Sequence, residues 1–183
     1  FNMKIEGIVN DSEVLFTSDE IKVGISNIAD TINEYFRDIK DCVTILPVMK
    51  GAIPFAGYLI PQLSFNTNIE YIHVTRYHQN IGTKDCHWIY KPNKSAVKDK
   101  AILVIDDILD EGITLLNIKD ELKLMGARSI VTAVLFDKKI NIKKATRADI
   151  VGLALPNKYV YGFGLDFKGS GRNLPNLYSF NEK

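Results

Sequence analysis

The sequence predicts an α/β fold with a doubly wound, mostly parallel sheet, and two observations support this. Four runs are apolar without the alternation of a half-exposed strand: residues 43–48, 101–105, 129–136 and 149–155. Unbroken hydrophobicity is typical of parallel strands that are covered on both faces. Segments with helical spacing of apolar residues lie between several of these runs, so helices would provide the cover.

The first helix is predicted at about residues 17–40. Thr17 and Glu20 match a capping box, and apolar residues then recur at helical spacing from Ile21 to Phe36. Residues 43–48 form a strand, Lys50-Gly51 a turn, and residues 52–63 a helix, with Pro54 where a first helical turn tolerates proline.

The second half repeats this order. Residues 69–75 predict a strand, and the polar residues 76–100 predict a long mobile or hairpin-like loop. The strand at 101–105 leads through a glycine-containing turn to a helix at 114–125, which Gly126 would cap. Strands at 129–136 and 149–155 complete the sheet.

Composition limits the classes of function. The 183 residues suit one domain, which we place at 3–183, and a formal charge of +1 argues against nucleic acid as a partner. No stretch has the apolar length of a membrane span, so we expect no membrane partner and a cytoplasmic protein. Cys42 and Cys86 have no metal or redox spacing and predict reduced thiols, with Cys42 buried.

Polar or glycine-containing segments follow four predicted strands. They are Lys50-Gly51, Asp106-Asp107, Asp137-Lys138 and the stretch after Leu155. Ligands of open α/β sheets bind beyond the carboxyl ends of the strands, so these segments should meet at one crevice.

Residues 104–115, VIDDILDEGITL, contain the strongest functional signal. A buried strand delivers Asp106, Asp107 and Asp110, and a turn at Gly112 then opens a helix whose N–H groups could bind phosphate, with Thr114 adding a hydroxyl. A phosphorylated sugar with magnesium would use both the carboxylates and the N–H groups. The acids could instead be solvated loop residues, or the acidic pair of a phosphoreceiver, but that pair is expected nearer the start of a shorter chain.

This segment resembles the 5-phosphoribosyl-1-pyrophosphate motif of type I phosphoribosyltransferases. Further segments of the chain resemble the hypoxanthine-guanine branch of this family: residues 48–51, 135–138, 156–160, 164–166 and 172–174. The resemblance implies the Rossmann-like fold of that family, with a core at about 15–155 and a C-terminal base-binding hood at about 156–183. It also implies a purine salvage enzyme that uses Mg²⁺ and converts hypoxanthine or guanine to IMP or GMP.

The resemblance implies roles for individual residues. Asp110 would be the catalytic base near the purine N7. Residues that would bind the ribosyl donor or nucleotide are Lys50, Gly51, Asp106, Asp107, Ile108, Leu109, Asp110, Glu111, Gly112, Ile113, Thr114 and Arg172. Residues that would bind the base are Lys138, Lys158, Tyr159, Val160 and Asp166. Magnesium would be held by Asp106, Asp107 and Asp166, and Arg76 and Tyr77 would begin a mobile active-site loop. The peptide at Lys50-Gly51 is often cis in this family.

Two residues depart from the family pattern, and alternatives stay open. Many relatives have a hydroxyl residue in place of Glu111 and a basic or polar residue in place of Ile113. The chain could be a nucleotide-sensing regulator without turnover, or a transferase that acts on xanthine, adenine or a pyrimidine. Lys138 suits an O6 acceptor better than the amino group of adenine. The family usually forms dimers or tetramers, so a homodimer or homotetramer is expected.

Overall fold

A computed structural model of the chain describes residue 9 and residues 12–76 and 86–180. Its main element is a seven-stranded sheet in the order β5-β4-β2-β6-β7-β8, with β3 also paired to β2. The strands are β2 (Val43–Met49), β3 (Thr67–Ile69), β4 (Ile72–Arg76), β5 (Cys86–Tyr90), β6 (Ala101–Leu109), β7 (Ser129–Lys138) and β8 (Ile150–Leu155). β2, β6, β7 and β8 pair in parallel, which confirms the predicted fold class.

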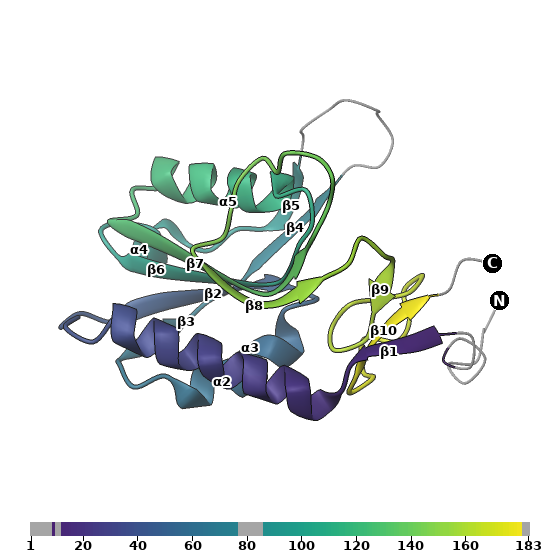
Figure 1. The fold of residues 1–183 in the computed structure, drawn as a ribbon. Helices are drawn as coiled ribbons and strands as arrows, with labels where there is room; N and C mark the ends of the chain where they lie inside the picture. The colour runs from purple at the N-terminus through teal and green to yellow at the C-terminus, as the bar shows by residue number, and fades with distance from the viewer. Residues whose placement is uncertain (1–8, 10–11, 77–85, 181–183) are drawn as a thin grey trace.

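Helices cover both faces of this sheet (Figure 1). α2 (Ser18–Tyr35) and α3 (Ile53–Leu59) lie on one face, and α5 (Ile113–Leu124) lies on the other. The predicted capping box of Thr17 and Glu20 is present, with both hydrogen bonds formed. Gly126 has a φ of 89°, which suits the residue just after a helix end. A short helix, α4 (Lys94–Val97), precedes β6.

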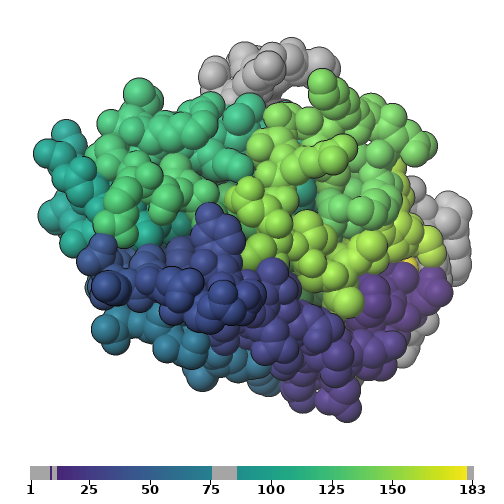
Figure 2. Space-filling view, turned by 60° about the vertical axis from the view of Figure 1, so that its left-hand side comes forward, coloured from purple at the N-terminus to yellow at the C-terminus, as the bar shows by residue number. Residues whose placement is uncertain are grey.

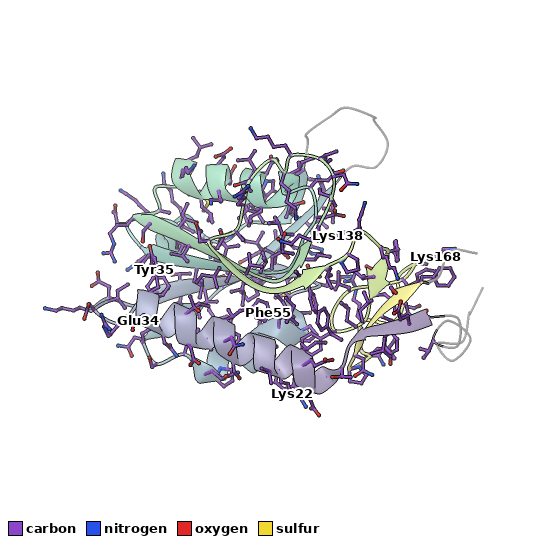
Figure 3. The ribbon with its side chains drawn as sticks, in the orientation of Figure 1. Lys22, Glu34, Tyr35, Phe55, Lys138 and Lys168 are labelled. Carbon is purple, nitrogen blue, oxygen red and sulfur yellow. The ribbon has the colours of Figure 1, made fainter. Side chains whose placement is uncertain are left out.

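The core consists of two apolar clusters, one on each side of the sheet. Ile21, Ile25 and Phe55 belong to the cluster under α2 and α3, and Figure 3 shows Phe55 between α3 and the sheet. Leu115, Ile118 and Leu122 of α5 belong to the opposite cluster. Both faces of β6 are therefore covered, which explains the unbroken apolar run at residues 101–105.

A second, three-stranded sheet forms a hood at the end of the main sheet. It contains β1 (Ser12–Phe16), β10 (Leu177–Phe180) and β9 (Val160–Tyr161), in that order and antiparallel. β1 precedes the residues expected to form the hood, so both ends of the described chain contribute to it. Figure 2 shows the purple N-terminal part beside yellow-green residues of the C-terminal part.

Several local features differ from the prediction. β6 continues through Asp106 and Asp107 to Leu109, because it pairs with β7 along that whole length. The predicted hairpin-like loop contains β5, which pairs antiparallel with β4. The buried position predicted for Cys42 is wrong, since its residue is exposed at the turn before β2. Among the described residues, neither Cys42 nor Cys86 forms a disulfide bond.

Among the residues that the structure describes, none of the helices combines the length and apolar character needed to cross a membrane.

Candidate active site

A cavity of about 540 Å³ lies beyond the carboxyl ends of β2 and β6. The predicted donor-binding residues that line it are Lys50, Gly51, Asp106, Asp107, Ile108, Leu109, Asp110, Glu111, Gly112, Ile113, Thr114 and Arg172. These residues come from two strand ends, one helix start and the hood. Of the four segments predicted to meet at one crevice, Lys50-Gly51 and Asp106-Asp107 line this cavity, and Asp137-Lys138 does not.

Residues 110–112 form a turn that leads into α5, which begins at Ile113. Gly112 is the N-cap residue and has a left-handed φ of 79°. A Cβ atom at this position would lie 2.7 Å from the Thr146 carbonyl oxygen, so the backbone here leaves no room for a side chain. The first N–H groups of a helix lack intrahelical acceptors and carry partial positive charge, so this end of the cavity can hold a phosphate.

Two adjacent carboxylates form the floor of the cavity. Asp106 is 8% exposed, and one of its oxygens accepts a 2.9 Å hydrogen bond from the Asp107 backbone N–H. An Asp107 oxygen accepts one of 2.8 Å from the Ile108 N–H. Burial, and next the charge of Asp107, raise the pKa of Asp106 well above its ordinary value. Burial also raises the pKa of Asp107, although hydrogen bonds and Arg172 oppose this.

Gly51 allows the turn after β2 to approach both the acidic pair and the hood. A Cβ atom at Gly51 would lie 1.5 Å from Asp107 Oδ2. A Cβ atom at Gly164, in the hood, would lie 2.0 Å from the Gly51 carbonyl oxygen. The absence of both side chains therefore brings three parts of the chain together. The cis peptide bond joins Met49 to Lys50, one bond before Lys50-Gly51.

A second cavity of about 230 Å³ adjoins the first. Its lining is Asp107, Ile108, Asp110, Lys138, Tyr159, Val160, Leu165, Asp166 and Arg172, of which Asp107, Ile108, Asp110 and Arg172 also line the first cavity. Figure 3 labels Lys138 at the end of the sheet that faces the hood. The ammonium of Lys138 lies 3.4 Å from Asp110 Oδ2, and its side chain is 16% exposed.

The hood side of this second cavity is ordered by polar contacts. Arg172 forms an ion pair with Asp166 Oδ1 and donates a 2.7 Å hydrogen bond to the Gly164 carbonyl oxygen. The other Asp166 oxygen accepts from the Gly169 N–H. The hydroxyl of Tyr159 donates a 3.2 Å hydrogen bond to the Asp166 carbonyl, while half of the Tyr159 residue stays exposed.

Not every predicted residue lies at these cavities. Lys158 lines neither of them, and its ammonium pairs with Glu13 of β1 at 3.0 Å. Arg76 ends β4, but its side chain and Tyr77 lie outside the described residues. Both Asp166 carboxylate oxygens have protein partners, so in this conformation they face Arg172 and Gly169.

Sequence reasoning missed several lining residues. His73, Thr75 and Ile89, from β4 and β5, line the first cavity, and Leu165 lines the second. They carry no motif of their own, since their place depends on which strands pair. Glu111 and Ile113, which depart from the family pattern, both line the first cavity.

The carboxylates of Asp106 and Asp107 suit a hard divalent cation. Such a cation would offset the cost of burying two adjacent negative charges, which is the cause of their raised pKa values. In the part of the chain that the structure describes, no group of three or more His, Cys, Asp or Glu side chains could hold a metal ion alone. Magnesium commonly takes one or two carboxylates and completes its shell with substrate phosphates and water, so the pair fits a cation that arrives with a phosphorylated ligand.

Comparison with known proteins adds to this geometry. Residues 15–168 match the phosphoribosyl transferase domain family. The chain is 30% identical over 174 residues to a hypoxanthine-guanine phosphoribosyltransferase of Dictyostelium discoideum, covering 93% of this chain and 96% of the relative. It is 30% identical over 166 residues to the enzyme of that name from Aquifex aeolicus, covering 91% and 93%. A solved hypoxanthine phosphoribosyltransferase variant from Trypanosoma cruzi, complexed with the product IMP, superposes with a TM-score of 0.84 at 25% identity, over 93% of this chain and 91% of that one.

Proposed function

The chain belongs to the phosphoribosyl transferase domain family, and we propose that it is a purine salvage enzyme of the hypoxanthine-guanine type. It would join hypoxanthine or guanine to the phosphoribosyl group of 5-phosphoribosyl-1-pyrophosphate and release pyrophosphate with IMP or GMP. The observation that carries this proposal is the pair of adjoining cavities, one suited to a phosphorylated sugar and one to a planar base.

The ribosyl donor would occupy the larger cavity. Its 5′-phosphate would accept hydrogen bonds from the backbone N–H groups of residues 110–114 at the start of α5. Its ribose hydroxyls would lie at Asp106 and Asp107, and its pyrophosphate at Lys50, Gly51 and Arg172, all of which line the cavity.

Magnesium fits the acidic floor and would neutralise the departing pyrophosphate there, with Asp106 and Asp107 as direct or water-mediated ligands. The two carboxylates would also stabilise the positive charge that develops on the sugar as the pyrophosphate leaves. Asp166 would reach a second cation only if it first exchanged its contact with Arg172.

The purine would occupy the smaller cavity. Lys138 would donate a hydrogen bond to the O6 oxygen, Tyr159 would stack on the ring, and the backbone of Val160 would contact its edge. Asp110 lines both cavities, and its carboxylate would accept the proton that the purine N7 releases. An ammonium beside O6 favours hypoxanthine, guanine or xanthine over adenine, whose amino group offers donors at that place.

We also propose a homodimer or homotetramer and a cytoplasmic location. The first is what the family suggests. The second is supported by the two cysteines, which form no disulfide bond among the described residues and so suit a reducing compartment.

The decisive test is an assay of the purified protein with the ribosyl donor, Mg²⁺ and each purine in turn. We expect IMP and GMP to form and AMP to form far more slowly. Binding of the donor without product from any base would favour a nucleotide sensor, and fastest turnover of xanthine would favour a xanthine transferase.

A variant tests the role of Asp110 in the same assay. Asp110→Asn should lower kcat by about 100-fold, the lower end of the effect of a general base, with a smaller change in the KM of the donor. An unchanged kcat would exclude Asp110 as the base.

A further inference from the structure

Residues 144–146, which we call the bracing segment, lie in the connection between β7 and β8 and contact the end of β6 and the turn at residues 110–112. The Lys144 ammonium donates a 2.7 Å hydrogen bond to the Leu109 carbonyl oxygen. The Ala145 N–H donates one of 2.8 Å to the Glu111 carbonyl. The Thr146 backbone lies where a side chain at Gly112 would be. Three successive residues therefore hold a turn that is distant in sequence.

Lys144 makes a second contact that reaches the base-binding side. Its ammonium lies 2.6 Å from Asp137 Oδ1, and both side chains are well buried, at 14% and 13% exposed. Asp137 directly precedes Lys138, and Leu109 directly precedes Asp110. The Lys144 ammonium therefore links Leu109, which precedes the proposed general base, to Asp137, which precedes the proposed hydrogen-bond donor to the purine O6.

The charge of Lys144 also acts on Asp137. Burial alone would raise the pKa of Asp137, but hydrogen bonds from Lys139 and Lys144 and their charges outweigh it and lower that pKa. The Lys139 side chain is 65% exposed, so solvent weakens its contribution. Loss of the buried Lys144 ammonium would leave a carboxylate and a carbonyl oxygen without their main buried donor.

We propose that Lys144 is a positioning residue that fixes Asp110 relative to Lys138 and thereby sets the affinity for the purine base. The proposal rests on the proposed transferase function. Lys144 lines neither the donor cavity nor the base cavity, so it would act only through its neighbours.

The test compares Lys144→Met with Lys143→Met. Lys143 lines the same neighbouring cavity of about 480 Å³ as Lys144, but it is exposed, which makes it a matched control. Steady-state kinetics well below the Tm should show kcat/KM for hypoxanthine about tenfold lower in Lys144→Met, the loss expected for a hydrogen bond to a charged group. The KM of the ribosyl donor should change less than about threefold, and Lys143→Met should match the wild type.

A double-mutant cycle with Lys138→Ala separates positioning from general destabilisation. If Lys144 acts through Lys138, the double variant should lose clearly less hypoxanthine kcat/KM than the product of the two single losses. Multiplicative losses, or equal changes for donor and base, would overturn the proposal. Lys144→Gln replaces Lys144→Met if the latter does not fold, with the same criteria. An inactive wild-type protein would instead refute the transferase function itself.

Discussion

Lys138 Nζ and Asp110 Oδ2 lie 3.4 Å apart where the two cavities meet. Each side chain would therefore affect the contact of the other with a bound purine. Removing Lys138 should therefore alter the choice of base. Lys138→Ala is expected to lower kcat/KM for hypoxanthine and guanine roughly tenfold or more, since a hydrogen bond from a charged donor contributes about 1.5–3 kcal/mol. The kcat/KM for adenine should rise relative to the values for these two bases, because the Lys138 ammonium would no longer place donor hydrogens against the adenine amino group.

Kinetics with the three bases and both proteins measure this effect. The KM of the ribosyl donor is the internal control and should change little. Equal losses for all three bases would assign Lys138 to the fold rather than to the base.

Asp106 allows a prediction about stability and pH. Its pKa is raised in the folded protein, first by burial and then by the charge of Asp107. The folded state therefore keeps a proton that the unfolded chain releases, and stability falls as pH rises from the ordinary carboxyl value of about 4 through the raised value. Asp106→Asn should raise the Tm of the ligand-free protein at neutral pH, by roughly 2–4 °C for each kcal/mol gained, and the gain should shrink toward pH 4.

Thermal melts over this pH range test the prediction, with Asp30→Asn on the exposed face of α2 as the control. A Tm gain that does not depend on pH would show that the charge of Asp106 is not the cause. Transferase activity should fall in Asp106→Asn, because the proposed contacts to ribose and cation need the carboxylate.

The limits of sequence reasoning are clearest for single side chains. Asp106, Asp107 and Asp110 could be placed at the cavity because a strand end fixes their position. Lys158 was predicted at the base but pairs with Glu13, and nothing in the sequence indicates that β1 lies beside it. Lys144 has no motif, since its partners Leu109 and Asp137 become neighbours only in the folded sheet.

At the scale of elements, the turn at Gly112 carries the sharpest prediction. A residue with a side chain would be strained at φ 79°, and its Cβ would meet the Thr146 carbonyl oxygen at 2.7 Å. Gly112→Ala should therefore shift the turn at residues 110–112. If the donor phosphate binds there and loses one hydrogen bond, the KM of the ribosyl donor should rise by about tenfold or more.

Gly57→Ala is the matched control, because a Cβ at Gly57 in α3 would meet nothing within 4 Å. It should leave the kinetics unchanged and stabilise the helix by about 0.5–1 kcal/mol. A normal donor KM in Gly112→Ala would mean that the phosphate binds elsewhere.

The predicted elements divide by the kind of signal they carry. The strands β2, β6, β7 and β8 were predicted because long apolar runs have few alternative structures. The capping box located the start of α2, whereas its end at Tyr35 falls five residues before the predicted one. β1, β9 and β10 were missed as strands, because they are short and owe their structure to pairing with one another.

At the scale of the whole molecule, the base cavity is formed by two parts that meet. The sheet contributes Asp107 and Lys138, the turn after β6 contributes Asp110, and the hood contributes Tyr159 and Arg172. The hood is also attached to the start of α2, where Asn176 accepts a 2.8 Å hydrogen bond from the Ser18 N–H. Substrates that contact both parts should therefore stabilise the protein as a unit.

Magnesium should be essential for donor binding and for turnover. The ribosyl donor is a polyanion, and it would enter a cavity whose floor holds Asp106 and Asp107. Like charges at about 4 Å repel by about 4 kcal/mol at an effective dielectric of 20, so a divalent cation between donor and carboxylates changes repulsion into attraction. Excess chelator should therefore abolish turnover, and added Mg²⁺ should restore it. The donor should raise the Tm strongly with Mg²⁺ and much less with chelator, whereas chelator alone should leave the Tm of the ligand-free protein unchanged. Full turnover in excess chelator would contradict the proposed role of the acidic pair, since the lysine and arginine side chains at the cavity would then suffice to bind and release the pyrophosphate.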